Sequence, residues 1–161
     1  MERNCGECTA CCKTHGVLEI LKMSGKWCIY CNVGQGCGIY AKRPRECRVF
    51  KCAWLFGIDG SGPQHRPDKI NIVPEYRKIS GIGMAMWFWE LEEGALRSDL
   101  TRKWSRRNLL LGNCVMHVSL DAGHKLYLPE RIGDLDRSYV FGSPEEEIEI
   151  VPFPESVSCF A

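Results

Sequence analysis

The residues of this 161-residue chain that are best suited to chemistry are its cysteines. There are eleven, and nine lie within the first 52 residues: Cys5, Cys8, Cys11, Cys12, Cys28, Cys31, Cys37, Cys47 and Cys52. The step Cys5-x2-Cys8-x2-Cys11 lets one tight loop point three thiols at a common centre, as iron–sulfur loops do. Structural zinc sites more often join two C-x2-C pairs, and Cys28 and Cys31 supply a second pair. The spacing therefore indicates a thiolate-bound metal and permits both iron–sulfur and zinc chemistry.

Disulfides are the main alternative use of clustered cysteines. Secreted disulfide scaffolds usually carry an even number of cysteines and an export signal. Here the number is odd, and the N-terminal sequence MERNCGECTACC has no apolar signal segment. We therefore expect metal ligation, in a reducing cytoplasmic compartment, rather than a disulfide framework.

The overall composition is that of an ordinary globular protein. Hydrophobic residues make up 45% and charged residues 25%, which excludes collagen-like and fully disordered classes. The longest nearly apolar run extends from Gly81 to Trp89, far short of the roughly 20 residues that span a bilayer. We expect no membrane partner. A net charge of +1 gives no reason to expect that the whole chain binds nucleic acid.

The charge is distributed unevenly. Residues 1–52 carry nine Lys or Arg and four Asp or Glu, a formal +5, and the remainder carries −4. Four thiolates around Zn²⁺ or a [4Fe–4S]²⁺ core leave a charge of about −2, which nearby cations can offset. We expect Arg43 and Arg48 to be cofactor-binding residues of this site. Their side chains would hold the cysteine loops in place through hydrogen bonds to backbone or sulfur atoms.

The pattern along the chain predicts an α+β fold in two parts that form one compact unit. Residues 1–56 form a small, irregular, cysteine-rich metal-binding region. In it Val17 to Met23 is an apolar stretch of undecided structure, 33–36 is a turn, and Pro44 begins a short helix towards Phe50. With so little apolar periodicity, this region needs a metal to supply its missing stability.

Residues 68–161 form the α+β part, with short antiparallel strands and one amphipathic helix. The apolar residues Leu96, Leu100, Trp104 and Leu111 fall near one helical face, Ser98 is the expected cap of this helix, and Gly112 is its expected end. Strands are expected over Lys69 to Val73 and Ile82 to Leu91, and 115–120 pairs with 125–128 as a hairpin. Residues 143–161 are expected to be an acidic, loosely ordered tail.

The cysteines and their neighbours also resemble a known family. The resemblance rests on Cys5-x2-Cys8-x2-Cys11-Cys12, Cys28, Cys37-Gly-Ile-Tyr40, Arg43-Pro44, Cys47-Arg48 and Cys52. This pattern is similar to the CxxCxxCC family of zinc- or iron-chelating, YkgJ-like cysteine-cluster proteins, and it covers about the first third of the chain. The resemblance implies a metal-binding protein. One methylase carries a similar cysteine motif, which is associated there with an iron–sulfur cluster and methyl transfer.

The family pattern implies eight metal ligands: Cys5, Cys8, Cys11, Cys12, Cys28, Cys37, Cys47 and Cys52. Cys31 stands outside the pattern, and three roles stay open for it: a substitute ligand, a redox-active thiol or a tolerated residue. We expect Cys114 to be a small core residue and Cys159 an exposed thiol. His15 follows the cluster and offers an alternative nitrogen ligand.

The predicted function is that of a metal-binding protein with clustered cysteine thiolates. Its role would be redox chemistry, metal handling or cluster-dependent transfer chemistry, and the sequence leaves open whether it is an enzyme. The C-x2-C-x2-C step favours a [4Fe–4S] cluster over zinc. The alternative is a structural zinc module whose basic helix, from Arg97 to Arg107, mediates protein or RNA interaction.

Overall fold

A mixed five-stranded sheet is the largest element of the computed structural model, which describes residues 3–58, 61–79, 81–132 and 148–161. Its strands are β3 (Ile72–Ile79), β4 (Gly83–Glu90), β5 (Cys114–Val118), β6 (His124–Tyr127) and β7 (Ile148–Val151), in that spatial order. β3 pairs with β4, and β5 with β6, in antiparallel fashion, whereas the β4–β5 and β6–β7 pairs are parallel. With its helices, the sheet confirms the α+β class.

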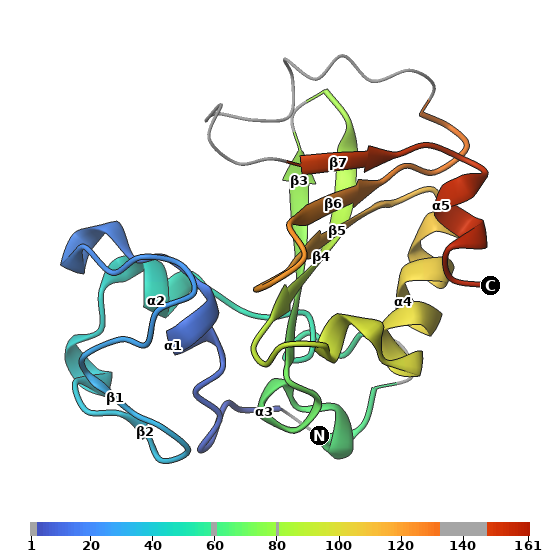
Figure 1. Cartoon of the computed structure of the whole chain (residues 1–161). Coiled ribbons are helices and arrows are strands. Elements are labelled where there is room, and N and C mark those ends of the chain that lie inside the picture. The colour runs from blue at the N-terminus through green and yellow to red at the C-terminus, as the bar shows by residue number, and fades with distance from the viewer. Residues whose placement is uncertain (1–2, 59–60, 80, 133–147) are drawn as a thin grey trace.

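Two helices lie against one face of this sheet (Figure 1). α4 (Asp99–Leu110) connects the parallel strands β4 and β5, and α5 (Glu155–Ser158) packs beside it near the C-terminus. Alternation along β4 separates the two faces, because Met86 and Phe88 join the core under the helices while Ala85 and Trp87 belong to the other face. The sheet thus has a buried apolar core that owes nothing to the cysteines of the N-terminal region.

The amphipathic helix is confirmed at both ends. The Ser98 hydroxyl accepts a hydrogen bond from the Thr101 amide at 3.3 Å, and Gly112 follows the helix with φ +81°. Trp104 and Leu109 are buried on its inner face. The prediction was wrong for Leu111, which is 67% exposed, because the helix ends at Leu110 and its periodicity ends there.

The first predicted strand was placed too early. Pro67 begins a short helix, α3 (Pro67–Ile70), and Asn71 then adopts a left-handed conformation with φ +58°. Proline favours the first turn of a helix, and asparagine tolerates the left-handed region better than most residues. The strand therefore begins at Ile72, and Lys69 lies outside it.

The predicted loosely ordered tail is corrected over residues 148–161. β7 pairs with β6, Val151 and Phe160 are buried in the helix-side core, and the Ser156 hydroxyl donates to the Leu128 carbonyl at 2.7 Å. These apolar side chains outweigh the acidic composition on which the prediction rested. Residues 143–147 lie outside the described residues.

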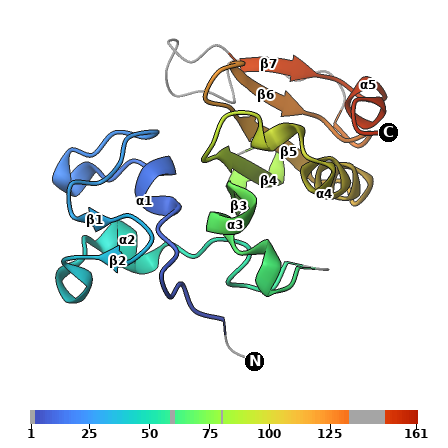
Figure 2. The same cartoon turned by 60° about the horizontal axis from the view of Figure 1, so that its bottom comes forward.

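Residues 3–52 form a separate lobe, called here the cysteine lobe, beside the lower ends of β3 and β4 (Figures 1 and 2). Its elements are α1 (Cys11–Thr14), β1 (Cys31–Asn32), β2 (Gly36–Cys37), α2 (Arg45–Val49) and the 3₁₀ turns η1 (Leu18–Ile20) and η2 (Tyr40–Lys42). The turn at 33–36 is confirmed as the link of the β1–β2 hairpin, and Pro44 immediately precedes α2. The undecided stretch from Val17 contains η1, closed by a bridge between Val17 and Lys22.

A shared core joins the cysteine lobe to the sheet. Ala10, Cys52 and Trp54 pack together with Val73 of β3 and Leu91 after β4. The Ala53 amide donates to the Pro74 carbonyl at 2.7 Å, which attaches the chain after Cys52 to the outer edge of β3. Because Ala53 already belongs to the helix-side core, the division of the chain falls near Cys52 rather than at residue 56.

Within the ranges that the structure describes, no helix has both the length and the apolar character needed to cross a bilayer.

The buried histidine of the sheet makes stability depend on pH. The His117 ring lies among Phe88, Tyr127 and Phe160, its Nε2 is 2.9 Å from the Ser105 hydroxyl, and burial lowers its pKa to about 3. The folded state therefore keeps His117 neutral, while the unfolded chain takes up a proton near pH 6.5.

We expect the free energy of unfolding to fall as the pH drops from about 6.5 towards 3, by up to about 1.4 kcal/mol per pH unit from this group. Urea unfolding of His117→Gln should show a shallower slope against pH than the unmodified chain. The half-exposed His65 provides the control, so His65→Gln should keep the original slope. An unchanged slope in His117→Gln would contradict this assignment.

Candidate metal centre

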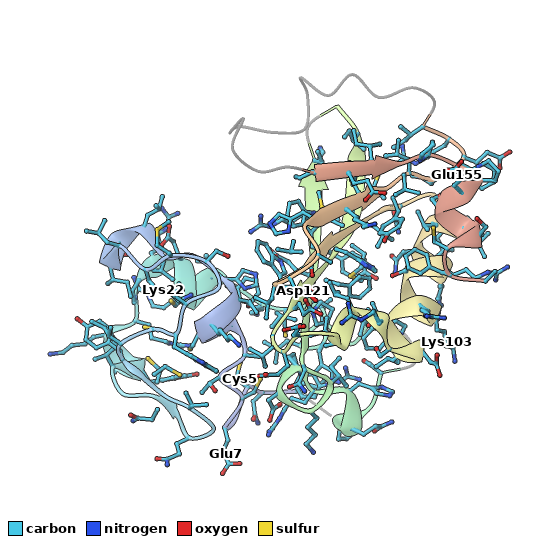
Figure 3. The ribbon with its side chains drawn as sticks, viewed as in Figure 1. Cys5, Glu7, Lys22, Lys103, Asp121 and Glu155 are labelled. Atoms are coloured by element: carbon cyan, nitrogen blue, oxygen red, sulfur yellow. The ribbon has the colours of Figure 1, made fainter. Side chains whose placement is uncertain are left out.

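A cavity of about 540 Å³ lies where the cysteine lobe meets β3. Seven of its lining residues are cysteines that the sequence analysis assigned as ligands: Cys5, Cys8, Cys11, Cys12, Cys28, Cys37 and Cys47. They come from the loop before α1, from α1 itself, from the hairpin region and from α2, so segments up to 42 residues apart converge on one space. In Figure 3, Cys5 and Lys22 mark two sides of this lobe.

The remaining predicted ligand, Cys52, is buried and does not line the cavity. Its thiol is close enough to Cys5 for the charges of the two groups to interact. Cys31 is also outside the lining, but its thiol forms a hydrogen bond with the thiol of Cys12. Cys114 is fully buried and Cys159 is exposed, as predicted.

Three thiols of the cysteine lobe show clearly raised pKa values. Burial raises the pKa of Cys8 to about 11, and burial together with the nearby Cys12 raises that of Cys31 to about 11. The hydrogen bond that the Cys12 thiol donates to Cys11, followed by burial, raises the pKa of Cys12. Thiols with raised pKa values are neutral at pH 7, so thiolate formation here requires a compensating positive charge.

Two cations of the cysteine lobe lie next to the thiols. Lys22 is buried, and its ammonium donates to the carbonyls of Lys13, at 2.9 Å, and His15. Burial lowers the pKa of Lys22, and the surrounding thiols, Cys28 foremost, act in the opposite direction. Lys22 thus holds the loop after α1 and places a positive charge among the cysteines.

Arg43 forms a hydrogen bond to the backbone of its own loop. Its Nε donates to the Tyr40 carbonyl at 3.0 Å, and its guanidinium lies 3.6 Å from the centre of the Tyr40 ring. Burial raises the pKa of Cys5 and of Cys47, and the charge of Arg43 partly offsets the rise at both thiols. Arg48 is exposed and is not among the lining residues.

The opposite wall of the cavity is a hydrogen-bonded network around Glu75 of β3. This buried carboxylate accepts from His15 Nε2 at 2.9 Å, from Trp89 Nε1 at 3.0 Å and from Arg77 Nε at 2.9 Å. Burial alone raises the pKa of Glu75, but the hydrogen bonds from His15 and Arg77 outweigh it and keep the pKa below its usual value. The other ring nitrogen of His15 is 2.8 Å from the Thr14 hydroxyl, so both nitrogens have partners here.

A second ion pair holds the loop that begins the cluster. Arg66 donates to both carboxylate oxygens of Asp68, at 2.6 and 2.8 Å, and Asp68 forms a hydrogen bond with the Cys8 thiol. Gly6 has φ +51°, and a side chain at this position would lie 3.4 Å from the Arg66 guanidinium. The left-handed backbone at Gly6 favours glycine, and the Asp68–Cys8 hydrogen bond connects α3 to the Cys5–Cys8 turn.

The sequence analysis missed Glu75, Arg77 and Asp68 as site residues. Glu75 and Arg77 line the cavity, and Asp68 contacts the Cys8 thiol, only because β3 and α3 fold back against the lobe. The sequence around Pro67 does indicate the start of a helix, because charged residues such as Arg66 and Asp68 suit that position. This pattern does not indicate that either residue contacts a cysteine.

The donor set fits a thiolate-bound metal, because sulfur is the ligand of iron–sulfur clusters and of structural zinc. All eleven cysteines are free thiols. Across the described ranges, no three His, Cys, Asp or Glu side chains are arranged to hold one metal ion.

Comparison with known proteins finds no match to this chain among family models, curated proteins or solved structures.

Substitution of Glu75 tests whether its hydrogen-bonded network attaches the cysteine lobe to the sheet. In Glu75→Leu, the His15 and Trp89 donors lose their buried acceptor, and we expect a loss of about 3 kcal/mol in the free energy of unfolding. Hydrogen exchange should show faster exchange at the amides around α1.

Glu92→Leu is the matched control. Its carboxylate is 62% exposed and lies 3.8 Å from Lys13 Nζ, so we expect a change within about 0.5 kcal/mol. Equal effects of the two substitutions would show that the Glu75 network does not attach the lobe.

Proposed function

We propose that this chain is a metal-binding protein that holds a cofactor through clustered cysteine thiolates, with a [4Fe–4S] cluster favoured over zinc. Its role would be redox chemistry, metal handling or cluster-dependent transfer chemistry. The observation that carries the proposal is the convergence of seven predicted ligand thiols on one cavity. The resemblance to the CxxCxxCC family, carried by the same residues, is part of the proposal.

The candidate ligands are the thiols that line the cavity, with Cys52 behind Cys5. Four thiolates complete one centre, so the set exceeds the need of a single cluster or zinc ion. When bound, the cluster would supply one-electron chemistry, or zinc would supply a structural crosslink. The protein's part is to present the sulfurs, and Arg43 and Lys22 provide positive charge near Cys5, Cys12 and Cys47.

The packing of the cysteine lobe supports the same proposal. In residues 3–51 the buried hydrophobic side chains are Ala10 and Val17, whereas exposed ones include Leu18, Leu21, Met23, Ile29, Val33, Tyr40 and Val49. A segment of this length with two buried hydrophobic side chains gains little stability from apolar burial. Metal–thiolate bonds provide the stabilisation that burial does not.

Metal analysis of anaerobically purified protein tests the proposal directly. We expect iron and acid-labile sulfide in equal amounts, about four of each per cluster, and a brown protein that absorbs near about 400 nm. Zinc outcompetes ferrous iron at loose thiolate sites, so the material must not be exposed to air before the analysis.

Zinc at about one or two per chain without sulfide would overturn the iron assignment and favour the structural zinc module, for which α4 offers the basic face. The absence of both metals from anaerobic material would overturn the proposed function itself.

Serine substitutions test the ligand assignment. Cys8→Ser and Cys12→Ser should each lower the metal content, because oxygen from serine does not replace a thiolate ligand well. Cys114→Ser, a buried substitution outside the lobe, and Cys159→Ser, an exposed one, are the controls and should leave the content unchanged.

Cys31→Ser should also leave the metal content unchanged, since Cys31 lies outside the cavity lining. If Cys31→Ser loses as much metal as Cys8→Ser, Cys31 is a ligand that its hydrogen bond to Cys12 already brings close to the cluster.

A further inference from the structure

Cys31 and Cys52 are the two cysteines of the lobe that do not line the cavity. Cys31 lies in β1, opposite Cys37 of β2, and is partly buried. It therefore stands beside the predicted ligands rather than among them, and its contacts with its neighbours decide what it can do.

Backbone hydrogen bonds hold the segment of Cys31 against α1. The Cys28 amide donates to the Cys12 carbonyl at 3.0 Å, and the Cys31 amide donates to the Cys28 carbonyl at 3.0 Å. The turn from Cys28 to Cys31 is thereby attached to Cys12. Within this arrangement, the thiol of Cys31 donates a hydrogen bond to the sulfur of Cys12.

A buried threonine contacts the Cys31 thiol from the other side. Thr9 is 4% exposed, and its Oγ1 accepts a hydrogen bond from the Gly34 amide at 3.1 Å. The Thr9 hydroxyl donates its proton to the sulfur of Cys31. Because a hydroxyl has a single proton, this bond uses the whole donor capacity of Thr9. The sulfur of Cys31 thus accepts one hydrogen bond and directs its own proton to Cys12.

These hydrogen bonds all run in one direction. The series begins at the Gly34 amide in the hairpin turn, passes through Thr9 and Cys31, and ends at the sulfur of Cys12. Successive bonds in such a chain polarise one another, so each bond strengthens the next. A series with this direction presents a positively polarised hydrogen to Cys12, which favours negative charge on its sulfur.

Cys12 carries negative charge when it binds a metal, because the ligand form of cysteine is the thiolate. The Cys12 thiol otherwise donates its proton to Cys11, and this bond ends when that proton leaves. The bond from Cys31 needs no proton on Cys12, and it becomes stronger when the accepting sulfur is charged. Hydrogen bonds of this kind orient metal ligands and tune the metal.

We propose that Cys31 is the hydrogen-bond donor to the ligand sulfur of Cys12, and that Thr9 holds the Cys31 thiol in the donating orientation. Cys31 is then a positioning residue and not a metal ligand. The inference rests on the proposed function, and it deepens that function by giving a role to the cysteine that the family pattern leaves out.

Two substitutions of Cys31 in the full chain separate a donor from a ligand. Cys31→Ala removes the donor, and Cys31→Ser keeps one in the form of a hydroxyl. Both variants, purified anaerobically, should contain as much metal per chain as the unmodified protein. Cys31→Ala should lose its metal to EDTA about tenfold faster or more, because hydrogen bonds to metal ligands contribute roughly 10–100-fold to metal affinity. Cys31→Ser should lose its metal at close to the unmodified rate.

Thr9 gives a second pair of variants, in which Cys31 itself is unchanged. Thr9→Val removes the hydroxyl and should speed the loss of metal in the same direction as Cys31→Ala, whereas Thr9→Ser should not. Cys114→Ala is the matched control, since it removes a buried thiol outside the lobe and should leave the rate unchanged. Circular dichroism of each variant shows whether its fold is retained. If Cys31→Ala loses its fold, the Thr9 pair decides between the same outcomes.

The reduction potential gives a readout that a change in packing alone does not predict. In protein that carries the favoured iron–sulfur cluster, Cys31→Ala and Thr9→Val should shift the potential to more negative values. The reason is that hydrogen bonds to sulfur stabilise the reduced, more negatively charged state. The serine variants should restore the unmodified potential.

Three results would overturn the role of Cys31. They are equal rates of metal loss in Cys31→Ala and the unmodified chain, a loss from Cys31→Ser as fast as that from Cys31→Ala, and a lower metal content in both variants, which would make Cys31 a ligand. Metal is counted in the unmodified chain in the same experiment. An unmodified chain without metal refutes the proposed function, whereas a metal-loaded chain whose rate of loss depends on neither Cys31 nor Thr9 refutes the role of Cys31 alone.

Discussion

The cysteine lobe surrounds a cavity lined by thiols instead of a packed hydrocarbon core, and the way in which the lobe is held together depends on this constraint. Ala10 and Val17 are the buried hydrophobic residues of residues 3–51, so the turns that carry the cysteines lack the close packing that fixes most loops. Such a lobe is held in place by polar contacts and by attachment to a stronger element. Three cations supply such polar contacts. Lys22 donates to backbone carbonyls, Arg43 lies over an aromatic ring, and Arg66 pairs with a carboxylate.

The stronger element is the sheet, and β3 is its edge nearest the lobe. At its outer edge, the Pro74 carbonyl accepts a hydrogen bond from the Ala53 amide. Its Glu75 carboxylate accepts a hydrogen bond from His15, which follows α1. A buried carboxylate is costly unless it is paired and hydrogen-bonded, and Glu75 meets that condition through three donors. The same network forms one wall of the cavity, so attachment of the lobe and shape of the site depend on one set of contacts.

Local patterns predicted the sheet half well. The serine cap, the helical spacing and the glycine stop defined α4, and the hydrophobic run from Ile82 to Leu91 defined β4, because these signals lie within one element. Prediction failed where long-range contacts decide. The apolar residues of 148–161 form a strand and a helix only because β6 and the helix-side core are there to receive them. Leu111 has the right spacing for the buried face, but it lies just beyond the last residue of the helix.

The sequence by itself determined the chemistry available to this protein: nine thiols in 52 residues, a surplus of positive charge around them, and too few periodic apolar residues to build a core. It could not determine which groups face those thiols across the cavity. Glu75, Arg77 and Asp68 lie in segments whose spacing indicates only a strand or the start of a helix. Their contacts with the lobe arise when β3 and α3 fold against it. Folding brings together residues about 60 positions apart, and local periodicity holds no information about such distances.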